Sequence, residues 1–511
     1  MMPLQRATAW VLLAGALGLA GCVRVGPDFQ SPREPWVEHW NSTALEQMSR
    51  SRPQPDFLRW WEVFADPTLD ALIAEADAYN SSLEIAGLRV MEARAQLGIA
   101  LSGRYPQLQQ ASADSLYVDQ RQSGGRNPQD RHFWQHSVGF DIGWELDFWG
   151  RFSRAIESAD AAYFAAHANY EDVLVLLRAQ VADTYFILRT FEARLRIARE
   201  NAERQKRSFE ITERLFRSGD SSELDFQQAK TQYLGTLATI PDLEGQAVRS
   251  RNALAALIGR PPGPLPELDA RTGLLPLPDQ AVLEDVPANL LLRRPDVRTA
   301  ELAVAAQSAL IGVAEADLYP SVSLLGSIVW STSSLSGASD SLDMVAGPSL
   351  VWNLFDHGRI KNDVRIQDAR LQQLIEAYRD RVRQAAREAD DAATGLAKAL
   401  ESERIRFESA EAAQRSLDLA NAQYLEGFAD FQRVLDAQRE LFQQQESYLL
   451  SRSDALSNLI GLYKALGGGW YRDGPLIDDA TREQMRQRTD WGDLLDEPQA
   501  ADPAATEDEP R

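Results

Sequence analysis

Few residues in this chain of 511 are cysteine or histidine, the types most typical of nucleophilic, proton-transfer and transition-metal sites. They are one cysteine, Cys22, and five histidines, His39, His132, His136, His167 and His357. No histidine lies in a motif with the carboxylate or thiolate partner that such sites use. His132 and His136 share one face of a predicted strand, but four residues along a strand span about 13 Å, too far for one metal ion. We therefore expect no catalytic site and no metal site, and we interpret these two histidines as residues at a barrel mouth.

Cys22 directly follows an N-terminal leader. Arg6 precedes an apolar run over residues 7–20, which is short for a membrane helix and indicates a cleaved signal segment. The run ends in Leu-Ala-Gly-Cys, which resembles the lipobox of bacterial lipoproteins, where the cysteine is acylated and becomes the first mature residue. An ordinary signal peptide with a chance cysteine is the alternative. Because Val23 and not Asp follows Cys22, the resemblance implies the outer membrane, with covalent lipid on Cys22 and no other cofactor.

The charge of the chain excludes one class of partner. The formal net charge is −22, so there is no basic surplus to neutralise nucleic-acid phosphates. Part of the acidic excess lies in residues 471–511, where periodic apolar positions are missing and the composition predicts a disordered tail. Beyond the leader, no apolar run approaches the ~20 residues of a membrane helix, so any further crossing must use strands.

An internal duplication organises the chain. The recurring pairs, all 208 positions apart, are Trp144 and Trp352, Gly150 and Gly358, Gly219 and Gly427, Ala229 and Ala437, and Gly259 and Gly467. A gapless match of this length indicates a repeated structural unit. Upstream, Tyr105-Pro106 recurs as Tyr319-Pro320, 214 positions on, and the difference falls in a hairpin, where length varies at little cost.

Each copy begins with a predicted β-hairpin. From His132 to Trp144 the even positions are mostly apolar or aromatic and the odd positions are polar or small, the alternation of a membrane strand. The preceding strand alternates less clearly. The sequence predicts hairpins at about 107–144 and about 321–352.

Each hairpin is followed by a long helix that no proline interrupts, over 151–217 and 359–425. At 1.5 Å per residue such a helix is a rod of roughly 100 Å. Apolar residues from Leu371 to Ala399 recur with a mean step of 3.5, the coiled-coil period. Gly219 and Gly427 suit left-handed helix caps, after which return helices are predicted over 222–259 and 430–466.

Four membrane strands cannot close a barrel, and an open edge in lipid is forbidden, so several copies must share one barrel. Two copies would supply eight strands filled by side chains, and three would supply twelve and room for a water-filled lumen. The geometry indicates a tube that hangs from the outer membrane into the periplasm.

Several motifs resemble those of one known family. In chain order they are the lipobox, Trp60-Trp61, Leu292-Arg293-Arg294-Pro295-Asp296-Val297-Arg298, Tyr319-Pro320-Ser321, Leu354-Phe355-Asp356-His357-Gly358-Arg359, Val434-Leu435-Asp436-Ala437-Gln438-Arg439 and Leu462-Tyr463-Lys464-Ala465-Leu466-Gly467-Gly468-Gly469-Trp470. Together they resemble TolC-like outer-membrane efflux proteins, in the lipoprotein branch that serves RND-type efflux pumps. His357 departs from the glycine of the family motif.

The resemblance implies an α+β membrane protein: a homotrimer whose 12-strand outer-membrane β-barrel, four strands per protomer, is continuous with a long periplasmic α-helical barrel. It implies a passive exit duct for small molecules, lipid-anchored in the outer membrane, with an inner-membrane RND-type pump and a periplasmic adaptor as partners. It also implies adaptor contacts at the turns of Gly219 and Gly427, although both glycines would be needed as helix caps without any partner.

The resemblance places a gate on the second return helix. Asp436 matches an acidic ring that narrows the periplasmic end, Arg439 lies one turn on, and Tyr424 matches a position of the same contacts. The first copy has Gln228 and Thr231 where the second has Asp436 and Arg439. The alternative is that both charged residues are ordinary solvated side chains.

Two other functions remain open at this point: a lipid-anchored periplasmic coiled-coil scaffold without a pore, and the outer-membrane duct of a protein secretion system. The predicted domains are a signal peptide (1–21), a lipid-anchored arm (22–58), a first repeat (59–259), a linker (260–290), a second repeat (291–470) and the acidic tail (471–511).

Overall fold

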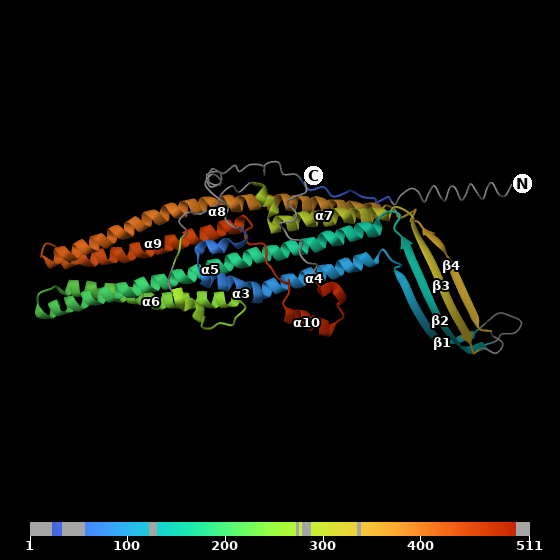
Figure 1. Ribbon diagram of the computed structural model, residues 1–511, viewed down its shortest axis with the longest axis horizontal. Coiled ribbons are helices and arrows are strands. Elements are labelled where there is room, and N and C mark those ends of the chain that lie inside the picture. The colour runs from blue at the N-terminus through green and yellow to red at the C-terminus, as the bar shows by residue number, and fades with distance from the viewer. Residues whose placement is uncertain are drawn as a thin grey trace. The chain divides into compact units, whose positions relative to one another are not determined.

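The computed structural model describes residues 23–32, 57–121, 130–271, 275–277, 288–334 and 339–496. The predicted signal segment, Cys22 and most of the arm lie outside the described residues. The elements, labelled in Figure 1, are in order η2 (Phe57–Phe64), α3 (Pro67–Tyr79), α4 (Ser81–Ser102), β1 (Leu108–Arg121), β2 (Asp130–Leu146), α5 (Arg151–Ser218), α6 (Glu223–Leu257), η3 (Pro266–Arg271), η4 (Ala288–Arg293), α7 (Pro295–Ala316), β3 (Ser321–Ser333), β4 (Ser341–Val351), α8 (Arg359–Leu425), α9 (Phe431–Ala465), α10 (Asp479–Arg488) and η5 (Gly492–Leu495).

These elements belong to two compact units. Unit 1 contains Val90–Ala166 and Thr299–Tyr378 together with the start of the arm, and therefore holds the whole sheet. Unit 2 contains the described parts of Glu34–Arg89, His167–Arg298 and Arg379–Arg511. The helices α4, α5, α7 and α8 contribute residues to both units.

The sheet of unit 1 joins the two predicted hairpins into one layer. Its four antiparallel strands follow the order β1-β2-β3-β4, side by side in Figure 1. The hairpin of each repeat stays intact, and β2 pairs with β3 between the repeats. The strands β1 and β4 are therefore the two edges of the sheet within the described chain.

One face of this sheet carries a row of large apolar side chains that crosses β2, β3 and β4. The register aligns Phe140 with Ile328, and Ile328 in turn with Met344. These side chains are 45%, 45% and 69% exposed, whereas Gly139 on the opposite face is buried. A contiguous exposed apolar face on a sheet marks a surface that contacts something other than water, as in membrane strands.

The long helices are observed as α5, with 68 residues, and α8, with 67. The sequence predicts 151–217 and 359–425 for them, so the observed bounds differ by one residue in α5 and by none in α8. Within α8 the coiled-coil period produces a buried seam. Its fully buried members are Tyr378, Val382, Ala385, Ala389 and Leu396.

In unit 2 each long helix packs against a return helix (Figure 1). The α8–α9 pair buries an apolar cluster of Ala413, Leu417, Ala420, Val434 and Leu441. The α5–α6 pair is joined near its end by stacked rings, with Phe216 and Phe226 centred 5.5 Å apart. Each helix hairpin is thus held together by apolar contacts.

Helix α7 differs from the sequence analysis, which expects no further run long enough for a membrane helix. In the part of the chain that the structure describes, α7 alone is long and apolar enough to cross a bilayer by length and composition, with a mean hydropathy of 1.2. Gln307 on this helix is buried and donates to the side-chain oxygen of Gln367 at 3.0 Å. Because packed core helices pass the same test, we interpret α7 as a packed helix.

The C-terminal segment corrects the prediction of a disordered tail over 471–511. Residues up to 496 are described, and α10 begins at a cap in which the Asp478 carboxylate accepts from the Thr481 N–H at 2.6 Å. The buried apolar side chains are Ile477, Met485 and Leu495. The segment approaches α4 at Gly87, where an added side chain would meet the backbone of Leu476 and the side chain of Ile477. The rest of the tail, 497–511, lies outside the described residues.

The start of the arm, residues 23–32, docks within unit 1. The N–H of Val25 donates to the Trp149 carbonyl at 3.1 Å, and the guanidinium of Arg154 donates to the Val25 carbonyl at 3.1 Å. Gly26 lies against Gly312 on α7, where a side chain on either residue would collide with backbone. The arm therefore follows a defined path directly after the position of Cys22.

Candidate functional site

The two tip turns end the long helices with the same local structure. Gly219 and Gly427 have φ of +85° and +77°, the left-handed conformation that favours glycine. Beyond them, Asp220 N–H donates to the Leu215 carbonyl and Phe428 N–H to the Gln423 carbonyl, the Schellman arrangement that satisfies the last carbonyls of a helix. Both glycines therefore act as helix caps, and their role in adaptor binding stays a prediction.

The turn at Gly219 lies next to one predicted gate residue. Tyr424 and Phe431 line a cavity of about 390 Å³ together with Gly219, Ser222 and Asp225. The Tyr424 ring meets the Phe431 ring edge-on, with centroids 5.2 Å apart, and packs on the α8–α9 apolar cluster. The structure thus brings Tyr424 into the tip region of both helix hairpins.

Asp436 and Arg439 lie together on α9. Arg439 Nη1 is 3.1 Å from Asp436 Oδ1, and Gln432 also donates to this oxygen at 3.1 Å. The side chains are 54% and 60% exposed. An exposed ion pair on one helix contributes only ~0–1 kcal/mol, so both charges remain available for contacts outside the chain.

The two helix hairpins of the chain contact each other through polar side chains. Gln438 on α9 donates to Ser208 on α5 at 2.9 Å, and both side chains are buried. Further along the same helices, Arg194 pairs with Glu446 at 3.1 Å. These two contacts form a polar seam between α5 and α9.

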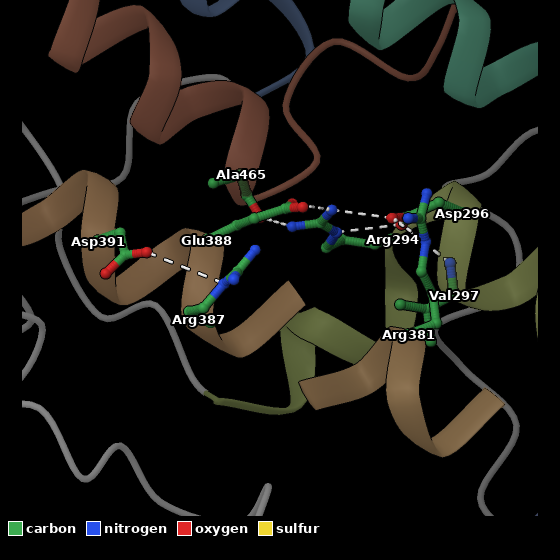
Figure 2. Close-up of polar contacts among 8 residues, drawn as sticks. All are labelled: Arg294, Asp296, Val297, Arg381, Arg387, Glu388, Asp391 and Ala465. Carbon is green, nitrogen blue, oxygen red and sulfur yellow. Dashed lines mark hydrogen bonds and ion pairs between the residues drawn. The ribbon is translucent and has the colours of Figure 1, made fainter. Parts of the chain in front are cut away.

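A buried ion network lies at the start of α7, within the Arg-Arg-Pro-Asp motif (Figure 2). Arg294 donates to Asp296 at 2.8 Å, to Glu388 on α8 at 2.7 Å, and to the carbonyl of Ala465 at the end of α9 at 2.6 Å. Arg381 approaches Asp296 from α8 at 2.9 Å. One guanidinium therefore connects three helices.

The charges of this network act on the carboxylates around it. Burial alone would raise the pKa of Asp296, but hydrogen bonds and charge from Arg294, with charge from Arg381, lower it below its usual value. The pKa of Asp172 is raised, first by burial and then by the negative charge of Asp296. The two arginines thus favour the ionised form of Asp296.

The histidines of the sheet do not form a metal site in the described residues. His132 Nδ1 is 3.3 Å from a carboxylate oxygen of Asp119, its cross-strand partner, a neighbour that the sequence analysis did not identify. No group of three or more possible metal ligands gathers anywhere in the ranges that the structure describes.

Sequence reasoning also missed the partners of Arg294. Glu388 and Ala465 lie 94 and 171 residues away, so no local pattern indicates them. The internal repeat contains a usable signal, because Arg294 lies 214 positions after Asn80, which donates to the carbonyl of Leu257, 208 positions before Ala465.

A sheet with an exposed apolar face and two hairpins of unusually long helices define the class of outer-membrane channel proteins. The sequence pattern of the family "Outer membrane efflux protein" matches residues 72–260 and 286–468, one segment for each repeat. The chain belongs to this family, and its location is the outer membrane.

Individual relatives match over most of their length. The probable outer membrane lipoprotein SilC of Salmonella typhimurium is 30% identical over 465 residues, which cover 88% of this chain and 96% of SilC. The cation efflux system protein CusC of Escherichia coli K12 is 31% identical over 469 residues, covering 89% and 98%. The solved structure of the outer-membrane channel OprN has a TM-score of 0.80 at 33% identity, covering 87% and 99%.

Proposed function

We propose that this protein is the outer-membrane exit duct of a tripartite efflux pump. Three copies share one barrel of twelve strands, and their long helices form a tube in the periplasm. The duct is passive: an inner-membrane RND-type pump supplies the energy, and a periplasmic adaptor connects the pump to the duct.

The sheet carries most of this proposal. It exposes an apolar face and has two edges, β1 and β4, whose backbone groups need partners in lipid. Four strands are too few to close a membrane barrel, and twelve leave room for a lumen. The similarity to CusC and OprN, an efflux protein and a channel by their names, supports the same conclusion.

Cys22 is the proposed lipid anchor, and the turns of Gly219 and Gly427 are the proposed adaptor contacts. The docked arm supports the first assignment, because it leads residue 23 into unit 1, the unit of the sheet. At the second turn the side chains of Leu425 and Phe428 are 83% and 80% exposed. Exposed apolar side chains of this size favour a protein contact.

The proposed gate consists of Asp436 and Arg439, with Tyr424 beside the tip turn. In a threefold assembly, Asp436 side chains near the axis repel one another and attract cations, while Arg439 connects neighbouring helices. The polar seam between α5 and α9 joins the second hairpin to the first, so its hydrogen bond and ion pair would have to break when the gate opens.

The test is the single-channel conductance of the purified protein in planar bilayers. Asp436→Ala should raise the closed-state conductance ~2-fold or more, because a ring of charge at a constriction controls ion passage. Gln228→Ala, at the equivalent position of the first repeat, is the matched control and should leave it unchanged. An unchanged conductance in Asp436→Ala would reject the gate assignment.

The same recording tests the scaffold alternative, and a resistance assay tests the secretion alternative. A coiled-coil scaffold would give no channels at all, and the exposed apolar face of the sheet argues against it. A protein secretion duct would conduct but would not restore drug or metal resistance to a strain that lacks its own efflux duct.

A further inference from the structure

The sheet repeats its own register. In the first hairpin Ala113 lies opposite Val138, and in the second hairpin Gly326 lies opposite Ala346. Val138 and Ala346 are 208 positions apart, and Ala113 and Gly326 are 213 apart. Every pair of the second hairpin has an equivalent in the first at the same two offsets, so β1 is equivalent to β3, and β2 to β4.

The offset of β1 is one less than the 214 that separates Tyr105 from Tyr319, so the first copy has one extra residue at the start of its strand. Gln107 occupies that position. Its side-chain oxygen accepts from the Glu145 N–H at 2.7 Å, and its amide donates to the Glu145 carbonyl at 3.2 Å. The Gln107 side chain thus makes the two hydrogen bonds to the Glu145 backbone that a paired strand residue would make, so the extra residue does not disturb the pairing that follows.

The junction between β2 and β3 shows how one hairpin joins the next. Asp141 lies opposite Ser327 in this junction, and Gly143 lies opposite Leu325. Adding 208 to a residue number in β2 gives its equivalent in β4, and subtracting 213 from a residue number in β3 gives its equivalent in β1. A junction of the same kind at the open edges of the sheet would therefore pair β4 with a β1. Because β1 and β4 are opposite edges of one four-stranded sheet, that β1 must come from another copy.

The surroundings of the two junctions support this equivalence. At the internal junction Tyr319 stacks on Trp149, with centroids 4.6 Å apart, and is 36% exposed; its repeat equivalent Tyr105 is 69% exposed. On the preceding helix a side chain added at Gly312 would collide with the arm and Arg154, whereas one added at the equivalent Gly98 would meet nothing within 4 Å. At the β1 edge of a single chain, Tyr105 and Gly98 are thus present as at the internal junction, but the strand that would pack beside them is not part of the same chain.

We propose that β4 of one copy pairs antiparallel with β1 of the next copy so that Ser349 lies opposite Asp114. The same register places Val351 opposite Ser112, and Leu350 opposite Ala113. It places the face of β4 that holds Leu350 on the same side of the sheet as the face of β1 that holds Ala113, and it sets the large Leu350 and Trp352 against the small Ala113 and Ala111. This inference rests on the proposed function, which requires several copies in one barrel.

Disulfide cross-linking tests the register in the full-length protein in outer membranes. Cysteines replace both partners in one chain, as Asp114→Cys with Ser349→Cys, and Cys22 is the only native cysteine. Directly opposite residues have Cα atoms ~4.5–5.5 Å apart, within the range of a disulfide. Mild oxidation should convert most of the protein into covalent multimers, and a reducing agent should return them to single chains.

Two controls use the same chemistry with a shifted partner. Ser349→Cys combined with Ser112→Cys or with Leu116→Cys places the sulfurs on diagonal neighbours, whose Cα atoms are roughly 7–8 Å apart, so the multimers should be absent. The in-chain pair Asp141→Cys with Ser327→Cys reproduces the junction within one copy and should form an internal bond. The pair Ser112→Cys with Val351→Cys repeats the test should the first variant not reach the membrane.

The outcomes separate the register from the function. The register would be wrong if a shifted pair formed the cross-link. It would also be wrong if no pair formed a cross-link between copies in a protein that still conducts as a multimer. Neither result would contradict the proposed function as a duct. A protein that is monomeric by chemical cross-linking and forms no channels would overturn both.

Discussion

The two repeats build the same joint with different chemistry. In the first, the amide of Asn80 donates to the carbonyl of Leu257, at the end of α6, at 2.8 Å. In the second, the guanidinium of Arg294 donates to the carbonyl of Ala465, at the end of α9, at 2.6 Å. Both bonds connect the start of the helix that enters a strand hairpin to the end of the return helix. The duplication preserved this bond although the side chain that makes it changed.

The difference lies in what else each side chain does. The oxygen of Asn80 caps its own helix by accepting from the N–H groups of Ser82 and Leu83. Arg294 is charged, 8% exposed, and needs the carboxylates of Asp296 and Glu388. The second joint therefore recruits α8 as well, at the cost of a buried charge that has to remain paired.

The largest expected effect follows from that charge. Arg294→Met should lower the free energy of unfolding by ~3–5 kcal/mol, because it leaves the buried Asp296 without its main partner. Asn80→Ala at the equivalent position should lower it by only about 1 kcal/mol, the usual cost of a lost helix cap. Chemical denaturation in detergent, followed by circular dichroism, measures both.

Arg387→Ala is the control for the charge. Arg387 lies 4.0 Å from Asp391 on the exposed side of α8, as Figure 2 also shows. The substitution should change the free energy of unfolding by no more than ~0.5 kcal/mol. Equal losses in Arg294→Met and Asn80→Ala would show that the two joints are energetically the same.

The effect of intermediate size is expected to be larger in the first repeat than in the second. Gly259 and Gly467 end the return helices with φ of +76° in both, but a side chain at 259 would lie 2.4 Å from the Tyr79 carbonyl, whereas one at 467 would lie 3.2 Å from Arg294 Cγ. Both alanine variants should lose ~1–2 kcal/mol for the left-handed conformation. Gly259→Ala should lose more, because backbone cannot move aside as a side chain can. A larger loss in Gly467→Ala, measured by the same denaturation, would contradict this account.

The smallest effect is a pH dependence confined to the second joint. The pKa of Asp296 is lowered in the folded protein: burial opposes this, and Arg294 and Arg381 overcome it. A lowered pKa contributes stability that is complete above the usual value of 3.8 and is lost as the pH falls towards the folded value. The stability difference between wild type and Asp296→Asn should thus be constant from pH 8 to 5 and shrink below about pH 4. A difference that stays constant down to pH 3 would argue against it.

Much of the fold could be predicted from local patterns. The period of two from His132 to Trp144 indicates β2, and the proline-free run after Arg359 indicates α8, because both signals depend only on neighbouring residues. The caps at Gly219 and Gly427 follow from the same local logic. The tail could not be predicted, since Leu476 and Ile477 lie close to Gly87, a residue almost 400 positions earlier in the chain.

The candidate site divides in the same way. Asp436 and Arg439 were found through a motif, and their pairing follows from a spacing of three residues on a helix. Tyr424 lies beside the turn of Gly219, more than 200 residues earlier in the chain, a contact that no motif reveals.

By itself, the sequence determined the repeated unit, its strands, its long helices and their caps, because periodicity, proline and glycine act within a few residues. Only the tertiary structure decided that β2 pairs with β3, that Arg294 bonds Ala465 and Glu388, and that the acidic segment around α10 folds. These features depend on which side chains are buried together, and burial is settled by packing between segments far apart in the chain.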